Sequence, residues 1–134
     1  MKMIRACAFL LAFACCVSSF APAQEKGKET TLRSGRKIWM LHFDQTEIKD
    51  DRGCCHSGWG MTYRTTLNAK DPELEKEIDE IWRLVRARVE RMGYKDAMIQ
   101  AVTGPASTPP QDQTVVTRSL VRQADGSWKR VPFY

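Results

Sequence analysis

The chain has 134 residues, a formal net charge of +5 and five cysteines. This length allows about one ordinary domain. A hydrophobic share of 43% and a charged share of 28% are typical of globular proteins, so they exclude collagen, a wholly disordered chain and a multi-span membrane protein. Five cysteines are too few for a disulfide-dense scaffold. The composition therefore indicates one small globular domain and does not indicate a particular function.

Residues 1–23 have the three parts of a secretory signal peptide. A short positive segment is followed by an uncharged apolar run over residues 6–17, and Ala21-Pro22-Ala23 supplies an A-x-A cleavage site. A helix over the apolar run would span about 18 Å, which is too short for a hydrocarbon core of about 30 Å. A lipoprotein signal ending at Cys15 fits poorly because bulky Phe13 lies close before it. The pattern predicts cleavage before Gln24 and an exported protein, periplasmic or secreted.

Cleavage at this site would leave a weakly basic domain. Removing 23 of the 134 residues leaves 111, with 19 basic and 16 acidic side chains and a net charge of +3. Such a charge calls for no nucleic-acid partner, and the mature chain would have no membrane span. Residues 24–36 are polar and are predicted to be a flexible leader, whereas residues 37–134 are predicted to form a single domain.

Two strands are expected before the helix. Residues 37–43 are apolar at consecutive positions, and residues 59–67 alternate as a half-buried strand does. The alternation in the second strand places one set of side chains on the core face: Trp59, Met61, Tyr63, Thr65 and Leu67. Residues 44–57 read as a long charged connection between the two strands.

The segment from residue 72 to residue 92 has the clearest pattern, that of an amphipathic helix. Asp71 can cap its start, Pro72 suits the first helical position, and Gly93 supplies a stop. Apolar residues recur at steps of three and four: Leu74, Ile78, Ile81, Trp82, Val85, Val89 and Met92.

Charge is sorted along this helix, with acids first and arginines later, as the helix macrodipole favours. Pairs at four-residue spacing are expected between Asp79 and Arg83 and between Arg86 and Glu90. Four arginines on one helix can form a surface for anions or nucleic acid. The nearly even balance of acids and bases instead favours an ordinary solvated face.

Three further strands complete the expected fold. They cover residues 97–102, 114–122 and 127–133, and Asp125-Gly126 predicts a hairpin between the last two. The order is β-β-α-β-β-β. It predicts an α+β domain with a mainly antiparallel sheet covered on one face by one long amphipathic helix.

The triplet Cys54-Cys55-His56 is the candidate functional loop. Thiolate and imidazole bind zinc or copper, and His42 could add a fourth ligand. Paired zinc cysteines are, however, usually two to four residues apart, so adjacent cysteines form a weak metal candidate. The triplet alone specifies no reaction.

Export would place Cys54 and Cys55 in an oxidising compartment. A bond between these neighbours would be strained, because consecutive Cα atoms lie 3.8 Å apart and disulfides usually need 4.4–6.8 Å. An intermolecular bridge and two free thiols therefore remain open alternatives.

The sequence contains no coherent catalytic set. Neither a dinucleotide fingerprint nor a phosphate loop is present, and the aromatic residues are expected in the core, with Trp128 the one most expected to be partly exposed. The function predicted from the sequence is therefore a non-enzymatic binding or interaction module without a cofactor, whose partner is an unknown protein or small molecule. The alternative is a thiol- or metal-dependent activity at Cys54, Cys55 and His56.

Overall fold

The structure, a computed structural model, describes residues 27–49, 55–105 and 107–131. Within these residues the elements follow one another as β1 (Lys28–Thr31), β2 (Lys37–Lys49), β3 (Cys55–Arg64), α1 (Glu73–Arg91), β4 (Asp96–Thr103), η1 (Pro110–Asp112), β5 (Thr114–Arg122) and β6 (Trp128–Val131).

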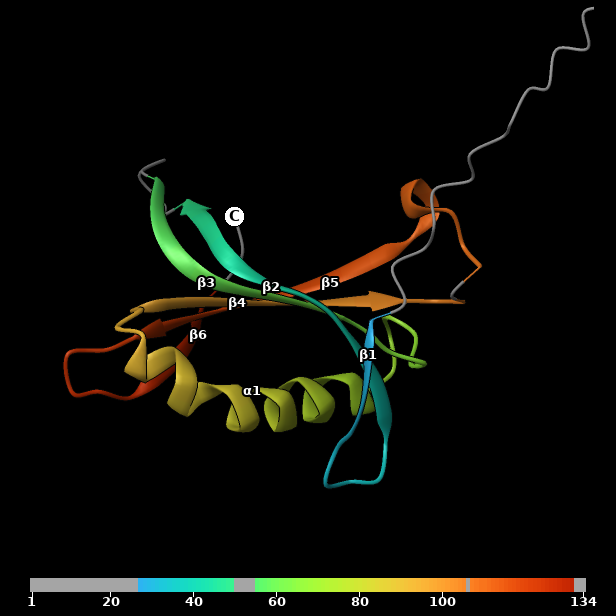
Figure 1. The fold of residues 1–134 in the computed structure, drawn as a ribbon, viewed down its shortest axis with the longest axis horizontal. Helices are drawn as coiled ribbons and strands as arrows, with labels where there is room; N and C mark the ends of the chain where they lie inside the picture. The colour runs from blue at the N-terminus through green and yellow to red at the C-terminus, as the bar shows by residue number, and fades with distance from the viewer. Residues whose placement is uncertain (1–26, 50–54, 106, 132–134) are drawn as a thin grey trace, which may run out of the picture.

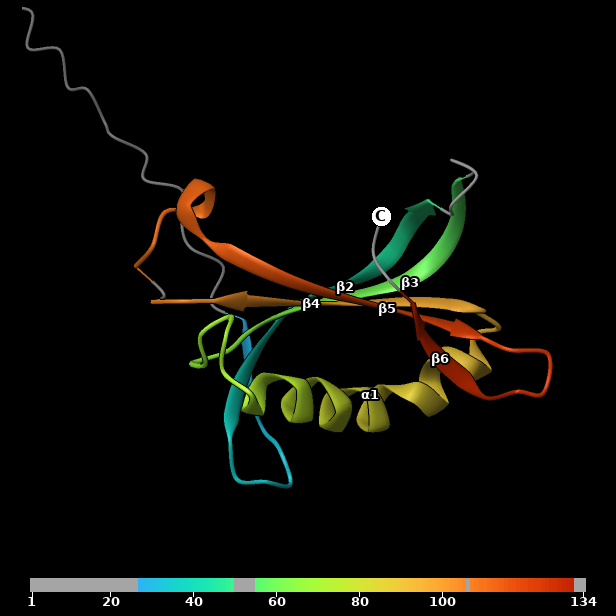
Figure 2. The ribbon, with the colours of Figure 1, turned by 180° about the vertical axis from the view of Figure 1, so that it is seen from behind.

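The strands form one sheet in chain order, with α1 lying along one face (Figure 1). β3 and β4 are parallel, and α1 is the crossover that joins them. All other neighbouring strands are antiparallel. The view from behind shows that the far end of the β2–β3 hairpin curves away from α1 (Figure 2). The α+β class, the mainly antiparallel sheet and the single covering helix are therefore confirmed.

Both ends of α1 are set by the predicted residues. The Asp71 Oδ1 accepts a hydrogen bond from the Glu73 backbone N–H at 2.9 Å, which satisfies one of the free donors at the helix start. At the other end, Gly93 adopts a φ of 80°, and the Tyr94 N–H donates to the Val89 carbonyl at 3.3 Å. This left-handed turn with its six-to-one bond is a Schellman cap.

The core lies between α1 and the covered face of the sheet. The helix buries its predicted stripe from Leu74 to Val89, whereas Met92, predicted as the last member of the stripe, follows the helix end and is exposed. The predicted core positions of β3 alternate into the same layer. Its members include Ile38, Trp59, Met61, Tyr63, Leu74, Ile78, Ile81, Trp82, Val85, Val89, Ala97, Ile99, Ala101 and Leu120. Trp128 is half-buried and packs edge-on against Trp82, with 4.8 Å between ring centroids. The expectations for these two tryptophans are confirmed.

The expected loop over residues 44–57 is wrong. β2 continues to Lys49 and β3 begins at Cys55, so only residues 50–54 separate them, and these lie outside the described residues. A bulge between Met40 and His42 shifts the register. This polar stretch forms a strand because it extends the antiparallel pairing of β2 with β3. A side-chain hydrogen bond from Gln45 Nε2 to Ser57 Oγ at 2.8 Å also joins the two strands.

The flexible leader predicted over residues 24–36 is wrong from residue 28 onward. β1 pairs with β2, and Leu32 is buried in the core. The predicted signal peptide lies outside the described residues and stays a prediction. Among the described residues no helix is both long enough and apolar enough to cross a membrane.

Ion pairs fasten the acidic half of α1 to the sheet. Glu75 accepts hydrogen bonds from Arg118 on β5, with 3.0 Å from Nε, and from Arg130 on β6. The bond from Arg118 is the main reason that the pKa of the Glu75 carboxyl lies below its ordinary value. Arg130 also binds Asp79 at 2.6 Å, so the expected pair between Asp79 and Arg83 is replaced by a contact between helix and sheet.

Two further contacts also involve acidic side chains of α1. The Arg36 guanidinium, from the turn between β1 and β2, reaches the buried Glu77 carboxylate at 3.4 Å. The expected pair between Arg86 and Glu90 is confirmed at 2.8 Å, and Glu90 also accepts a hydrogen bond from the Trp128 indole. The acids of the helix are thus held largely by groups outside it.

Substitutions on opposite faces of α1 should separate core from surface. Val85→Asp should destabilise the domain by several kcal/mol, because it places an unpaired charge in the core. Arg86→Ala removes only an exposed pair and should cost about 0.5 kcal/mol or less. Chemical denaturation of both variants measures the difference, and equal losses would contradict the assignment of the buried face.

Candidate functional site

The candidate site is centred on Arg64, the last residue of β3. Tyr63 and Thr65 on either side of it are buried, and alternation along a strand places Arg64 on the opposite face of the sheet, away from α1. Its Cα partners in the neighbouring strands are Trp39 on β2 and Val102 on β4. Arg64 is therefore flanked by an apolar residue on each neighbouring strand, at the end of a strand that is central in the sheet.

An open pocket of about 450 Å³ lies beside this arginine. Its volume falls within the range of small-molecule sites. The pocket is formed where β3 and β4 end, and β2 supplies one wall. Its lining residues are Trp39, Arg64, Thr65, Thr66, Leu67, Asn68, Gly104 and Pro105.

Local hydrogen bonds shape the chain around the pocket. The buried Thr65 hydroxyl oxygen accepts the Leu67 N–H at 3.1 Å, which turns the chain as it leaves β3. Asn68 Oδ1 accepts the Lys70 N–H at 3.0 Å and makes a second turn. At the end of β4, Gly104 has a φ of 98°, a conformation that side chains disfavour. Because β3 and β4 are parallel, these turns leave the sheet at the same edge.

Arg64 carries a buried donor without an acceptor. Its Nη1 atom is inaccessible to solvent and has no hydrogen-bond partner. A buried donor left unpaired costs about 1–3 kcal/mol, and more when the group is charged. The same side chain lines the pocket, so an anion bound there would supply an acceptor once the guanidinium turns Nη1 toward it.

The chemistry of the pocket is that of binding. Indole, leucine and proline side chains offer apolar contact, and one guanidinium offers a fork of donors that matches a carboxylate. Among the described residues that line the pocket there is no acid, histidine or cysteine. The described lining therefore supplies neither a general base nor a thiol nucleophile.

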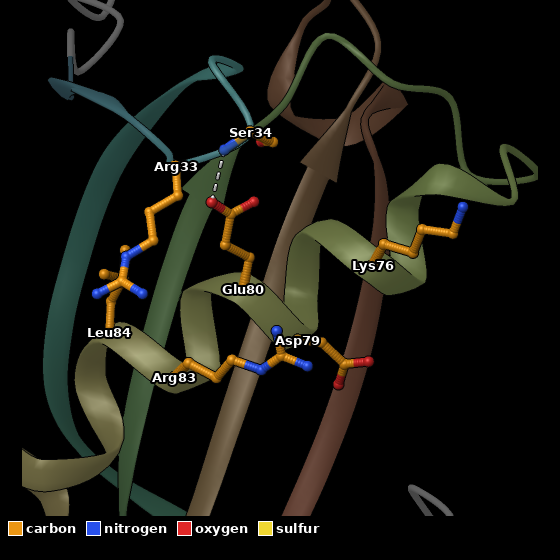
Figure 3. A pocket seen from close by; sticks show the side chains of 7 residues that line it. All are labelled: Arg33, Ser34, Lys76, Asp79, Glu80, Arg83 and Leu84. Atoms are coloured by element: carbon orange, nitrogen blue, oxygen red, sulfur yellow. Dashed lines mark hydrogen bonds between the residues drawn. The ribbon is translucent and has the colours of Figure 1, made fainter.

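A larger cavity of about 590 Å³ lies between α1 and the turn that joins β1 to β2 (Figure 3). Its lining combines both signs of charge, from Arg33, Arg83 and Lys76 against Asp79 and Glu80. The acids already have partners: Glu80 accepts the Ser34 N–H at 2.9 Å and Asp79 binds Arg130. These lining side chains are mostly exposed and charged, so the Arg64 pocket, whose lining is more apolar, is the better candidate for a ligand with an apolar body.

The metal ligands considered from the sequence are described only in part, so the metal hypothesis stays a prediction. Cys54 lies outside the described residues, and only the backbone of Cys55 and His56 is described, at the start of β3. His42 is opposite Thr62, whereas His56 is opposite Ile48. The six residue steps from 42 to 48 span about 20 Å along a strand, so the backbones of His42 and His56 lie far apart on the hairpin.

The described residues contain no group of three or more histidine, cysteine, aspartate or glutamate side chains placed to hold a metal. The thiol hypothesis at Cys54 and Cys55 stays a prediction. Sequence analysis missed Arg64 as a site residue, and it treated Trp39 as core. The available signal was an arginine on the second face of an otherwise threonine-rich and apolar strand.

Comparison with known proteins adds no relative. The chain matches no family model, no curated protein and no solved structure.

Replacing Arg64 by methionine should leave the domain at least as stable as the wild type. The variant keeps an unbranched side chain and removes a buried donor that has no partner. Thermal and urea unfolding without ligand would measure the change. A loss of more than about 1 kcal/mol would show that the guanidinium has an internal partner that stabilises the fold.

Proposed function

We propose that this protein is a non-enzymatic binding protein whose Arg64 pocket takes a small carboxylate with an apolar body. The observation that carries this proposal is the buried Nη1 of Arg64, which has no acceptor and lies beside an apolar pocket. A carboxylate supplies two acceptor oxygens in the geometry of the guanidinium fork. The expected export of the chain would place this binding outside the cytoplasm.

Two parts of the ligand would meet two parts of the pocket. Its carboxylate pairs with Arg64, and its apolar body contacts Trp39 and Leu67. A charge-assisted hydrogen bond contributes about 1.5–3 kcal/mol, and each buried methylene adds about 0.8 kcal/mol. Aromatic acids and medium-chain fatty acids combine both features at a size that fits about 450 Å³.

Binding alone accounts for the described lining better than catalysis does. General acid–base catalysis needs a titratable group within hydrogen-bond reach of the reacting atom. The described lining offers only hydroxyl, amide and guanidinium groups. The activity at Cys54, Cys55 and His56 remains the alternative, and no contact of a described side chain favours it.

Calorimetric titration tests the proposal with phenylacetate and octanoate as probes. Benzyl alcohol and octanol are the neutral counterparts that lack the carboxylate. The wild-type protein should bind the acids and bind the alcohols much more weakly. Arg64→Gln should raise the Kd of the acids by about ten- to a hundredfold, because it removes the charged fork.

Arg91→Gln is the matched control, because it removes the same charge from the exposed face of α1, away from the pocket. It should leave the Kd nearly unchanged. Arg64→Lys keeps the charge without the planar fork and should bind with intermediate affinity. Equal affinity of the wild type and Arg64→Gln for the acids, or no binding of either acid by the wild type, would refute the proposal.

A further inference from the structure

A second surface, independent of the Arg64 pocket, lies on the C-terminal half of α1. It combines exposed arginines with exposed apolar side chains, and we call it the arginine patch. Its members are Arg33, Arg83, Arg88, Arg91, Phe43, Leu84 and Met92. Phe43, Leu84 and Met92 are 44%, 46% and 52% exposed, and a group of exposed apolar side chains is typical of an interaction surface.

Helical spacing brings these residues together. Leu84, Arg88 and Met92 follow one another at steps of four and form one row on the side of the helix, next to its buried stripe. The Arg88 guanidinium carbon lies 6.0 Å from the centre of the Phe43 ring, which connects this row to β2. The Arg33 side chain extends from the turn between β1 and β2 and lines the same cavity as Arg83 and Leu84 (Figure 3).

The positive charge of the arginine patch is offset only in part, by Asp79 and Glu80, which line the same cavity as Arg33 and Arg83. None of its four arginines makes an ion pair with a described carboxylate. The six acids of α1 are already engaged, four of them with arginines of the sheet or of the turn between β1 and β2: Glu73, Glu75, Glu77, Asp79, Glu80 and Glu90. The near balance of acids and bases in the helix sequence therefore does not hold at this surface.

We propose that the arginine patch docks the protein onto an anionic lipid bilayer. Arginines near such a surface are attracted by its negative potential and can bind lipid phosphates. Large apolar side chains between cations are the features that insert at the boundary of headgroups and acyl chains. The positive charge of the patch complements the negative surface of such a bilayer, and its exposed apolar side chains match the apolar boundary beneath the headgroups.

Docking through the arginine patch would leave the Arg64 pocket open. Arg64 points to the face of the sheet opposite α1, whereas the patch includes the outer side of α1. A docked protein would therefore present the pocket away from the bilayer. The two proposals are independent, and either can fail without the other.

Flotation of the purified mature chain with lipid vesicles tests the docking proposal. One vesicle preparation mixes phosphatidylglycerol with phosphatidylcholine, and the other contains phosphatidylcholine alone. The wild type should float with the anionic vesicles and not with the neutral ones, and added salt should weaken this binding. The triple variant Arg83→Gln, Arg88→Gln, Arg91→Gln should bind about a hundredfold more weakly, since three surface cations are lost.

The matched control removes three positive charges elsewhere on the surface, in the variant Lys28→Gln, Lys70→Gln, Lys129→Gln. It should keep most of the binding. Leu84→Ser with Met92→Ser should weaken binding while the dependence on salt is retained. Equal losses in the two triple variants would show attraction by net charge alone and overturn the proposal. Absence of wild-type binding would overturn it as well, and selective binding to an acidic polypeptide in its place would assign the patch to a protein partner.

Discussion

The packing of α1 against one face of the sheet is the interaction on which the rest of the molecule depends. Ile78, Ile81 and Val89 are buried there against the alternating side chains of β3 and β4. Because α1 joins two parallel strands, it also places the ends of β3 and β4 at the same edge. In the part of the chain that the structure describes, no helix covers the opposite face. A pocket can therefore form on that face at the strand ends.

The position of an arginine relative to α1 decides whether it has a carboxylate partner. Arg36, Arg118 and Arg130 reach the acids of α1 and hold the helix to the strands. Of the helix arginines, Arg86 pairs with Glu90, whereas Arg83, Arg88 and Arg91 make no ion pair with a described carboxylate. Arg64 differs from both groups, because it lies among apolar neighbours with one nitrogen buried and unpaired. Stability therefore explains the first group, and binding is the better explanation for the others.

Local patterns predicted much of the fold and little of the site. The helix, its caps and the final strand pair follow from spacing and turn residues that act over a few positions. The second half of β2 could not be predicted from such local patterns, because its polar residues 44–49 form a strand only through pairing with β3. β1 was missed for the same reason. The Arg64 pocket joins residues from β2, β3 and the segment after β4, and no local pattern connects them.

The central claim is that Arg64 lacks an internal acceptor and takes one from a bound carboxylate. NMR of the arginine side-chain N–H groups during titration with phenylacetate tests it most directly, with Arg64→Lys identifying the Arg64 signal. The account predicts that the Arg64 guanidinium signals shift and saturate with the ligand, whereas those of Arg118 and Arg130, already bound to carboxylates, stay in place. Arg64 signals that do not respond, or that respond no more than those of exposed arginines, would contradict it.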